Sequence, residues 1–150
     1  MKRNLGAIWY IIFGMMFLLG ACSTDDDDTT REELKGDVVL SVEVYDDGSE
    51  RIVSILAATE ETFSCSNYNL AVDTRIRNGE LRICYEEVIK YSFCERAIGP
   101  ATYKWELGNA GPGEYPIEVR VEKEKSLGTL VVEEDTGYLK FDQLNRIQLQ

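Results

Sequence analysis

Apolar and polar residues alternate along most of the chain after residue 36. Residues 38–44 read VVLSVEV, for example, so that every second position from Val38 to Val44 is apolar. This period of two is typical of a β-strand with one buried face, and no comparable helical stripe follows. Further strands are predicted at 51–56, 68–76, 81–89, 102–107, 115–122, 127–132 and 138–141, with a last one at the C-terminus.

Two turn signals predict hairpins and their registers. Asp47-Gly48 tolerates the positive φ angles of a tight turn. Pairing around it sets Val42 opposite Val53, and the apolar faces of the two strands then agree. The same register sets Leu40 opposite Ile55.

Asn78-Gly79 is the clearer hairpin signal. A two-residue Asn-Gly loop makes Arg77 face Glu80, which places an opposite-charge pair beside the turn. The pairs predicted further along this hairpin are Ile76–Leu81, Thr74–Ile83, Val72–Tyr85 and Tyr68–Ile89.

Short strands separated by frequent turn signals predict an all-β fold, an antiparallel β-sandwich of about seven to eight strands. The stretch Gly113-Glu114-Tyr115-Pro116-Ile117-Glu118-Val119, which follows Trp105-Glu106-Leu107, resembles the "G-x-Y-x-I-x-V" strand start of immunoglobulin-like and fibronectin-type domains. The resemblance spans residues 105–119 alone and implies an immunoglobulin-like sandwich. A small β-barrel is the alternative fold.

The N-terminal segment has a different pattern. Lys2 and Arg3 precede an uncharged apolar run over residues 5–19, and the small residues Gly20 and Ala21 follow. This is the three-part layout of a secretory signal. A membrane-spanning anchor is the alternative, because the run is near the lower limit of about 17 residues for a span.

Leu19-Gly20-Ala21-Cys22 resembles the lipobox of bacterial lipoproteins. The resemblance implies that residues 1–21 are a cleaved N-terminal signal helix. It also implies that Cys22 receives fatty acyl chains of the palmitate type on a diacylglyceryl group and at the new N-terminus. Several acyl chains give stable membrane anchoring where a single chain is marginal.

The next residues, Ser23-Thr24 and the four aspartates 25–28, resemble the surface-export signal of lipoproteins from Bacteroidota. This implies a protein anchored in the outer membrane and facing the cell surface, with a periplasm-facing location as the alternative. The charge run is also typical of a solvated tether. We therefore predict a flexible acidic tether over residues 22–35 and a single β-sandwich domain over residues 36–150.

The charge balance restricts the partners and the chemistry. The chain has 27 acidic and 16 basic residues, for a net charge of -11, which argues against a nucleic-acid partner. It has no histidine, the side chain best suited to proton transfer near neutrality and the commonest metal ligand. No cofactor or metal site is predicted.

Three cysteines remain besides Cys22, and an exported chain is expected to form a disulfide. Residue numbers paired across the Asn78-Gly79 turn add up to 157, and those of Cys65 and Cys94 add up to 159. These two cysteines should therefore meet near the open end of the hairpin and form a disulfide. Cys84 faces Asp73 in this register, and we predict a free, half-buried thiol.

No catalytic motif is present in the sequence, and carboxylate pairs such as Glu86-Glu87 are expected by chance among 27 acidic residues. We predict that the protein is not an enzyme. The candidate contact residues are the aromatics Tyr103, Trp105 and Tyr115, which flank the glycine-rich loop 108–113. An exposed pair could stack on sugars or anchor a protein partner, whereas a buried Trp105 would be a core residue.

These observations predict a non-enzymatic, lipid-anchored cell-envelope protein that serves as an interaction or accessory subunit of a surface complex. Its partners would be the membrane, through the lipid anchor, and an outer-membrane protein or a glycan. One alternative is a surface glycan-binding lipoprotein that uses the three aromatics. Another is a small protease inhibitor that uses an exposed loop such as 108–114.

Overall fold

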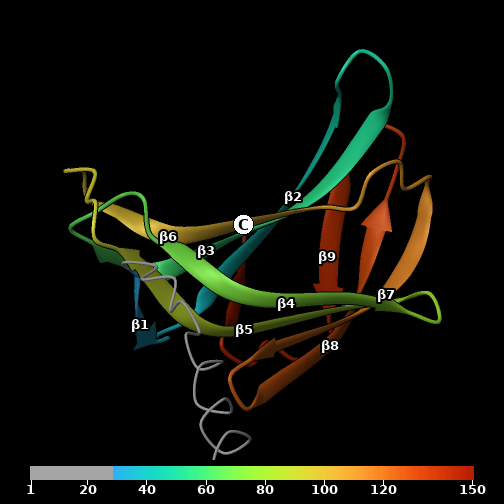
Figure 1. The fold of residues 1–150 in the computed structure, drawn as a ribbon. Coiled ribbons are helices and arrows are strands. Elements are labelled where there is room, and N and C mark those ends of the chain that lie inside the picture. The colour runs from blue at the N-terminus through green and yellow to red at the C-terminus, as the bar shows by residue number, and fades with distance from the viewer. Residues whose placement is uncertain (1–28) are drawn as a thin grey trace, which may run out of the picture.

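The computed structural model describes residues 29–150, which form ten strands and no helix (Figure 1). The predicted signal peptide 1–21 and lipidation site Cys22 lie outside the described residues. The strands are β1 (Thr29–Glu33), β2 (Val38–Asp46), β3 (Arg51–Phe63), β4 (Asn69–Arg77), β5 (Glu80–Tyr91), β6 (Gly99–Glu106), β7 (Gly113–Val121), β8 (Glu124–Val132), β9 (Gly137–Phe141) and β10 (Ile147–Leu149). The all-β prediction is confirmed, with ten strands where seven or eight were expected.

The first strand corrects the part of the predicted tether that the structure describes, residues 29–35, whereas residues 22–28 lie outside the described residues. We expected residues 22–35 to be flexible, but β1 pairs with β5 from Thr29 opposite Tyr91 to Glu33 opposite Glu87. Arg31 forms an ion pair with Glu87, and the side chain of Leu34 is buried. Since backbone pairing and ion pairs hold β1 in place, its TTREE sequence needs no apolar alternation, which is why the pattern did not reveal it.

The strands form one rolled sheet rather than two separate antiparallel sheets. Its order is β10-β2-β3-β6-β4-β5-β7-β8-β9, with β1 beside β5. The sheet curls until β9 lies against β2, where a Cβ on Gly137 would be 2.7 Å from Val42 Cγ1 (Figure 1). This shape is closer to the small barrel than to the sandwich. The β5–β7 and β10–β2 pairs are parallel, which differs from the predicted antiparallel arrangement. The sequence could not show this, because alternation predicts which face of a strand is buried but not which strand lies beside it.

The register predicted from Asn78-Gly79 is confirmed next to the turn, where Arg77 faces Glu80. Asn78 and Gly79 have positive φ angles of 53° and 80°, as this turn requires. The pairs Ile76–Leu81, Thr74–Ile83 and Val72–Tyr85 are all present. The predicted Tyr68–Ile89 pair is wrong, because a β-bulge shifts the register by one and sets Asn69 opposite Ile89.

The register predicted from Asp47-Gly48 is wrong by two residues. Val42 faces Ile55, not Val53, and Leu40 faces Ala57, not Ile55. The turn takes four residues, since the Asp47 N–H donates to the carbonyl of Glu50 at 3.2 Å. A shift of two leaves every side chain on its predicted face, so the buried face was still correct.

The Asp47 carboxylate holds this turn together. It accepts hydrogen bonds at 2.9 Å from the backbone N–H groups of Ser49 and Glu50 and from the Ser49 hydroxyl. The N–H group of Glu50, followed by the groups of Ser49, holds the pKa of Asp47 below its usual value of 3.8. The charged carboxylate therefore stabilises the folded protein above that value, and this contribution is lost as the pH falls through the lowered pKa.

Asp47→Asn is accordingly expected to be less stable than the wild type at pH 7, and the difference should shrink at a pH below 3.8, as the pH falls through the lowered pKa of Asp47. Urea unfolding of both proteins at the two pH values measures the difference. Asp46→Asn is the matched control, because no hydrogen bond or ion pair of the Asp46 carboxylate occurs within residues 29–150. A difference that persists unchanged at low pH would contradict this role of the carboxylate.

The interior of the rolled sheet is filled by side chains from nearly every strand. The largest fully buried ones are Tyr85, Leu34, Leu40, Ile55, Ile83, Ile117, Leu130, Val38, Val53, Val88, Val119 and Val121. At one end, Cys65 and Cys94 form the predicted disulfide, with their Cα atoms 5.2 Å apart. Cys84 is the free cysteine of this part of the chain, as expected.

Candidate functional site

Two of the three predicted contact aromatics point toward the core. Trp105 lies opposite Ile55 and Tyr103 opposite Ala57, and both of those β3 residues are buried. Directly opposed residues of an antiparallel pair share a face, so Tyr103 and Trp105 line the inner face of β6. Both are half-buried and pack against the core cluster. They are not an exposed stacking pair.

Tyr115, the third predicted aromatic, holds the glycine-rich loop. Its hydroxyl donates a 2.8 Å hydrogen bond to the carbonyl of Gly111, and its ring packs against the core cluster. The loop is also tied to β3, where the N–H of Val53 donates to the carbonyl of Gly108 at 3.1 Å. Tyr115 lies beside the loop, as expected, and its hydroxyl holds the loop backbone at Gly111.

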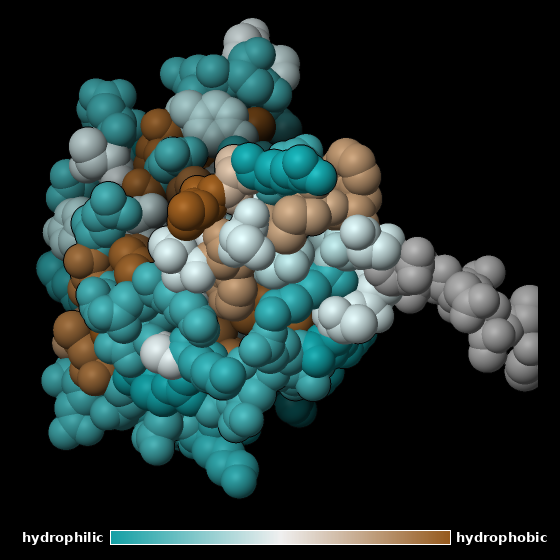
Figure 2. Space-filling view, turned by 90° about the vertical axis from the view of Figure 1, so that its left-hand side faces the viewer, coloured by the Kyte–Doolittle hydropathy of each residue, from teal (hydrophilic) through white to brown (hydrophobic). Residues whose placement is uncertain are grey.

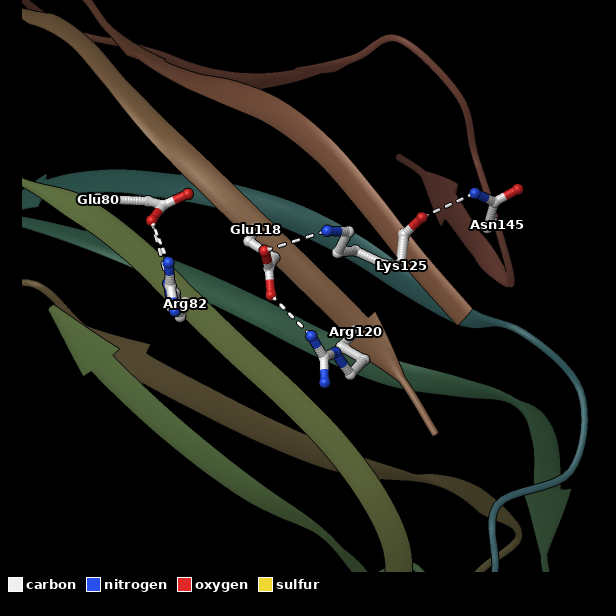
Figure 3. Close-up of polar contacts among 6 residues, drawn as sticks. All are labelled: Glu80, Arg82, Glu118, Arg120, Lys125 and Asn145. Atoms are coloured by element: carbon white, nitrogen blue, oxygen red, sulfur yellow. Dashed lines mark hydrogen bonds and ion pairs between the residues drawn. The ribbon is translucent and has the colours of Figure 1, made fainter. Parts of the chain in front are cut away.

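Charged side chains cover the outer face of β5 and β7 in pairs (Figure 3). The Arg82 guanidinium forms an ion pair with the Glu80 carboxylate at 2.7 Å. The Glu118 carboxylate forms ion pairs with Arg120 at 3.1 Å and with Lys125 at 3.7 Å. These partners stand two residues apart on one strand or on neighbouring strands, so their alternation puts them on the same face. Their charges are therefore largely compensated within the strip.

Cys84 lies in this strip, at a shallow hollow of about 180 Å³. The hollow is lined by Asp73, Arg75, Arg82, Cys84, Glu118 and Arg120. Burial raises the pKa of the Cys84 thiol, and the nearby Arg120 lowers it by less. The thiol is therefore protonated at neutral pH and a poor nucleophile.

One edge of β4 is open. β4 pairs with β5 along its length, but on its other side it pairs only at Asn69, with Thr102 of β6. Beyond this point β4 and β6 diverge (Figure 1). No strand of residues 29–150 covers β4 from Leu70 to Arg77 on this side.

Alternation of the backbone shows which groups of β4 point to this edge. The carbonyl of Tyr68 accepts a 3.2 Å hydrogen bond from the N–H of Thr102 in β6. Tyr68 and every second residue after it therefore direct their backbone N–H and C=O groups away from β5. Arg77, which closes the two-residue turn with Glu80, points toward β5. The even-numbered residues Val72, Thr74 and Ile76 therefore direct their N–H and C=O groups to the open edge.

An open strand edge is a template for the pairing of another strand. Three exposed charges, Asp73, Arg75 and Arg77, lie along β4, and charges of this kind limit indiscriminate edge-to-edge association. Ile76 adds an apolar side chain that is 63% exposed. The hydrophobic pattern does not reveal this site, since alternation is the same in edge strands and in central ones.

Residues 29–150 contain no group of three or more Asp, Glu, Cys or His side chains arranged to hold a metal ion. In the same part of the chain no helix is long and apolar enough to cross a membrane. The chain matches no known protein family, no curated protein and no solved structure.

Proposed function

We propose that this chain is a non-enzymatic, lipid-anchored protein of the cell envelope whose β-domain binds a protein partner as an accessory subunit of a surface complex. The observation that carries the binding role is the open edge of β4. Main-chain groups at such an edge give affinity to an added strand, and side chains such as Ile76 give selectivity. The lipobox-like Leu19-Gly20-Ala21-Cys22 supports the anchor, and the acidic run that follows supports export to the outer surface of the outer membrane.

The chemistry of the described residues agrees with a role in binding. The carboxylates of the charged strip are engaged in ion pairs with neighbouring arginines and Lys125, and the Cys84 thiol has a raised pKa. The immunoglobulin-like relationship suggested by Gly113–Val119 stays a prediction: it agrees with the all-β character of the domain but not with its single rolled sheet.

The two alternative functions have less support. Glycan binding by stacked aromatics requires exposed rings, whereas Tyr103 and Trp105 line the inner face of β6. A protease inhibitor needs an accessible loop that fits an enzyme cleft, and the loop 108–114 is tied to β3 and to Tyr115 instead. Neither alternative accounts for the open edge of β4.

Thr74→Pro tests the binding role. Proline removes an N–H group that points to the open edge and leaves the pairing of β4 with β5 intact. We expect capture of a membrane partner to fall by about tenfold, the effect of losing roughly one main-chain hydrogen bond and close strand contact. The measurement is a cross-linked pull-down of the full lipidated protein from native membranes, quantified by mass spectrometry.

Thr74→Ala is the matched control, because it removes the same side chain and keeps the N–H group. Equal capture by the proline and alanine variants, with both folded by circular dichroism, would contradict strand addition at β4. In that case a protein partner would have to bind elsewhere on the domain.

A further inference from the structure

The two most exposed large apolar side chains of residues 29–150 lie on one loop. This tip loop, residues 92–98, follows β5 and carries Phe93, 73% exposed, and Ile98, 82% exposed. It lies at the left-hand end of the molecule in Figure 1, and Figure 2 faces this end and shows apolar side chains at the surface among hydrophilic ones. Exposed apolar groups gathered on one loop commonly mark a contact with a partner or a membrane.

The tip loop is held in place while these side chains stay exposed. The disulfide of Cys94 attaches it to Cys65. The Asn67 side chain donates to the carbonyl of Phe93 at 2.7 Å, and its oxygen accepts from the N–H of Glu95 at 3.3 Å. With its backbone fixed, the loop presents Phe93 and Ile98 without a large loss of backbone entropy on binding.

The chain enters the domain beside this loop. Thr29, the first residue of β1, lies opposite Tyr91, the last residue of β5. Cys22 precedes Thr29 by seven residues, which span at most about 25 Å even when fully extended. If Cys22 carries the lipid, the tip loop is therefore at the end of the domain that faces the membrane.

The net charge of the protein does not attract it to a lipid surface. The whole chain is acidic, with a net charge of -11, and an acidic protein is repelled by an anionic lipid surface. Lys90 is already paired with Glu32. Arg96 is exposed and forms no ion pair within residues 29–150, so one cation near Ile98 is free for a lipid phosphate. Glu95, its neighbour, accepts a hydrogen bond from Ser66 at 3.4 Å.

We infer that the tip loop is a second membrane contact, in which Phe93 and Ile98 enter the boundary between headgroups and acyl chains of the membrane that holds the lipid anchor. This inference rests on the proposed anchoring through Cys22. Insertion of apolar side chains at the interface adds to acyl anchoring and fixes the orientation of the domain. The part of the open β4 edge near Ile76 then lies on the side of the domain away from the bilayer. From the rise per residue of a strand, it is roughly 30 Å from the tip loop along β5.

Tryptophan fluorescence of the full lipidated chain in phosphatidylcholine vesicles tests the inference. In Phe93→Trp, the added tryptophan is expected to show a blue-shifted emission and to be quenched by vesicle lipids with brominated acyl chains. Ile76→Trp is the matched control, because Ile76 is also exposed, at 63%, and lies near the opposite end of β5. Trp105 is present in every variant and provides the baseline.

Ile98→Trp repeats the test at the second position, so that one misfolded variant does not decide the outcome. Quenching of both loop variants beyond the Ile76→Trp control supports the membrane contact. Co-flotation with vesicles without such extra quenching would overturn the inference and leave the anchor intact. If the lipidated chain did not co-float with the vesicles, the proposed lipid anchor would be overturned. The proposed orientation of the tip loop toward the membrane would then be overturned as well.

Discussion

Replacing both Cys65 and Cys94 with serine is expected to lower the free energy of unfolding by about 3 to 4 kcal/mol. The disulfide joins residues 29 positions apart, and without it the unfolded chain regains the entropy of that closed loop. Urea unfolding measures the loss, and the thermal midpoint should fall by roughly 10 °C or more. Because the disulfide fastens the tip loop to the buried Cys65, the loop residues should also exchange amide hydrogens faster when it is removed.

Cys84→Ser is the control for this experiment, since Cys84 is free and only half-buried. It should change the stability by about 1 kcal/mol or less. If the double variant were as stable as this control, the disulfide would not be the constraint that closes the end of the β4–β5 hairpin. A small effect on stability with faster exchange confined to residues 92–98 would instead restrict its role to the tip loop.

The second large effect is expected at Gly128, in β8. A Cβ built there collides with the backbone carbonyl of Lys140 and lies 2.5 Å from Phe141 Cδ1. Gly128→Ala should therefore lower the free energy of unfolding by about 3 kcal/mol, because a backbone atom cannot move aside as a flexible side chain can. Denaturant unfolding again provides the measurement.

Gly111→Ala is the matched glycine variant, because nothing lies within 4 Å of its added Cβ. Its stability should stay within about 0.5 kcal/mol of the wild type. Equal stability of the two alanine variants would mean that β8 and β9 do not approach as closely as the rolled sheet requires. Gly128 pairs with Phe141, so the result reports directly on the β8–β9 edge that closes toward β2.

The proposed membrane contact and the proposed partner edge fit the same orientation of the domain. The chain enters at Thr29 beside the tip loop, and β5 runs from there to the Asn78-Gly79 turn. An accessory subunit that rests on Phe93 and Ile98 would hold the open edge of β4 clear of the lipid. A neighbouring surface protein would then reach that edge without competing with the bilayer.

The hydrophobic pattern alone predicted most strands and their buried faces. Alternation along 38–44 and 115–122 depends on local side-chain direction, which every strand shares whatever its neighbours are. The Asn78-Gly79 turn also set its hairpin register, because a two-residue loop leaves one way to pair the strands beside it. That register was close enough to predict the disulfide of Cys65 with Cys94.

Other features depended on contacts that the pattern does not encode. The hairpin at Asp47 has a four-residue turn because the Asp47 carboxylate caps two N–H groups, and this moved the register by two. Alternation predicted that Tyr103 and Trp105 share a face, but the pairing of β6 with β3 decided that this face is the inner one. The polar segment Thr29–Glu33 forms strand β1 because its backbone pairs with β5.

The sequence by itself therefore determined the all-β class, the buried positions, one hairpin and the disulfide, since each follows from local geometry or from short separations along the chain. The tertiary structure alone decided which strands are neighbours, where the sheet leaves β4 uncovered, and that Thr29 lies beside the tip loop. The physical reason is that a strand forms the same hydrogen bonds with any partner, so only the packing of the whole chain selects the partner.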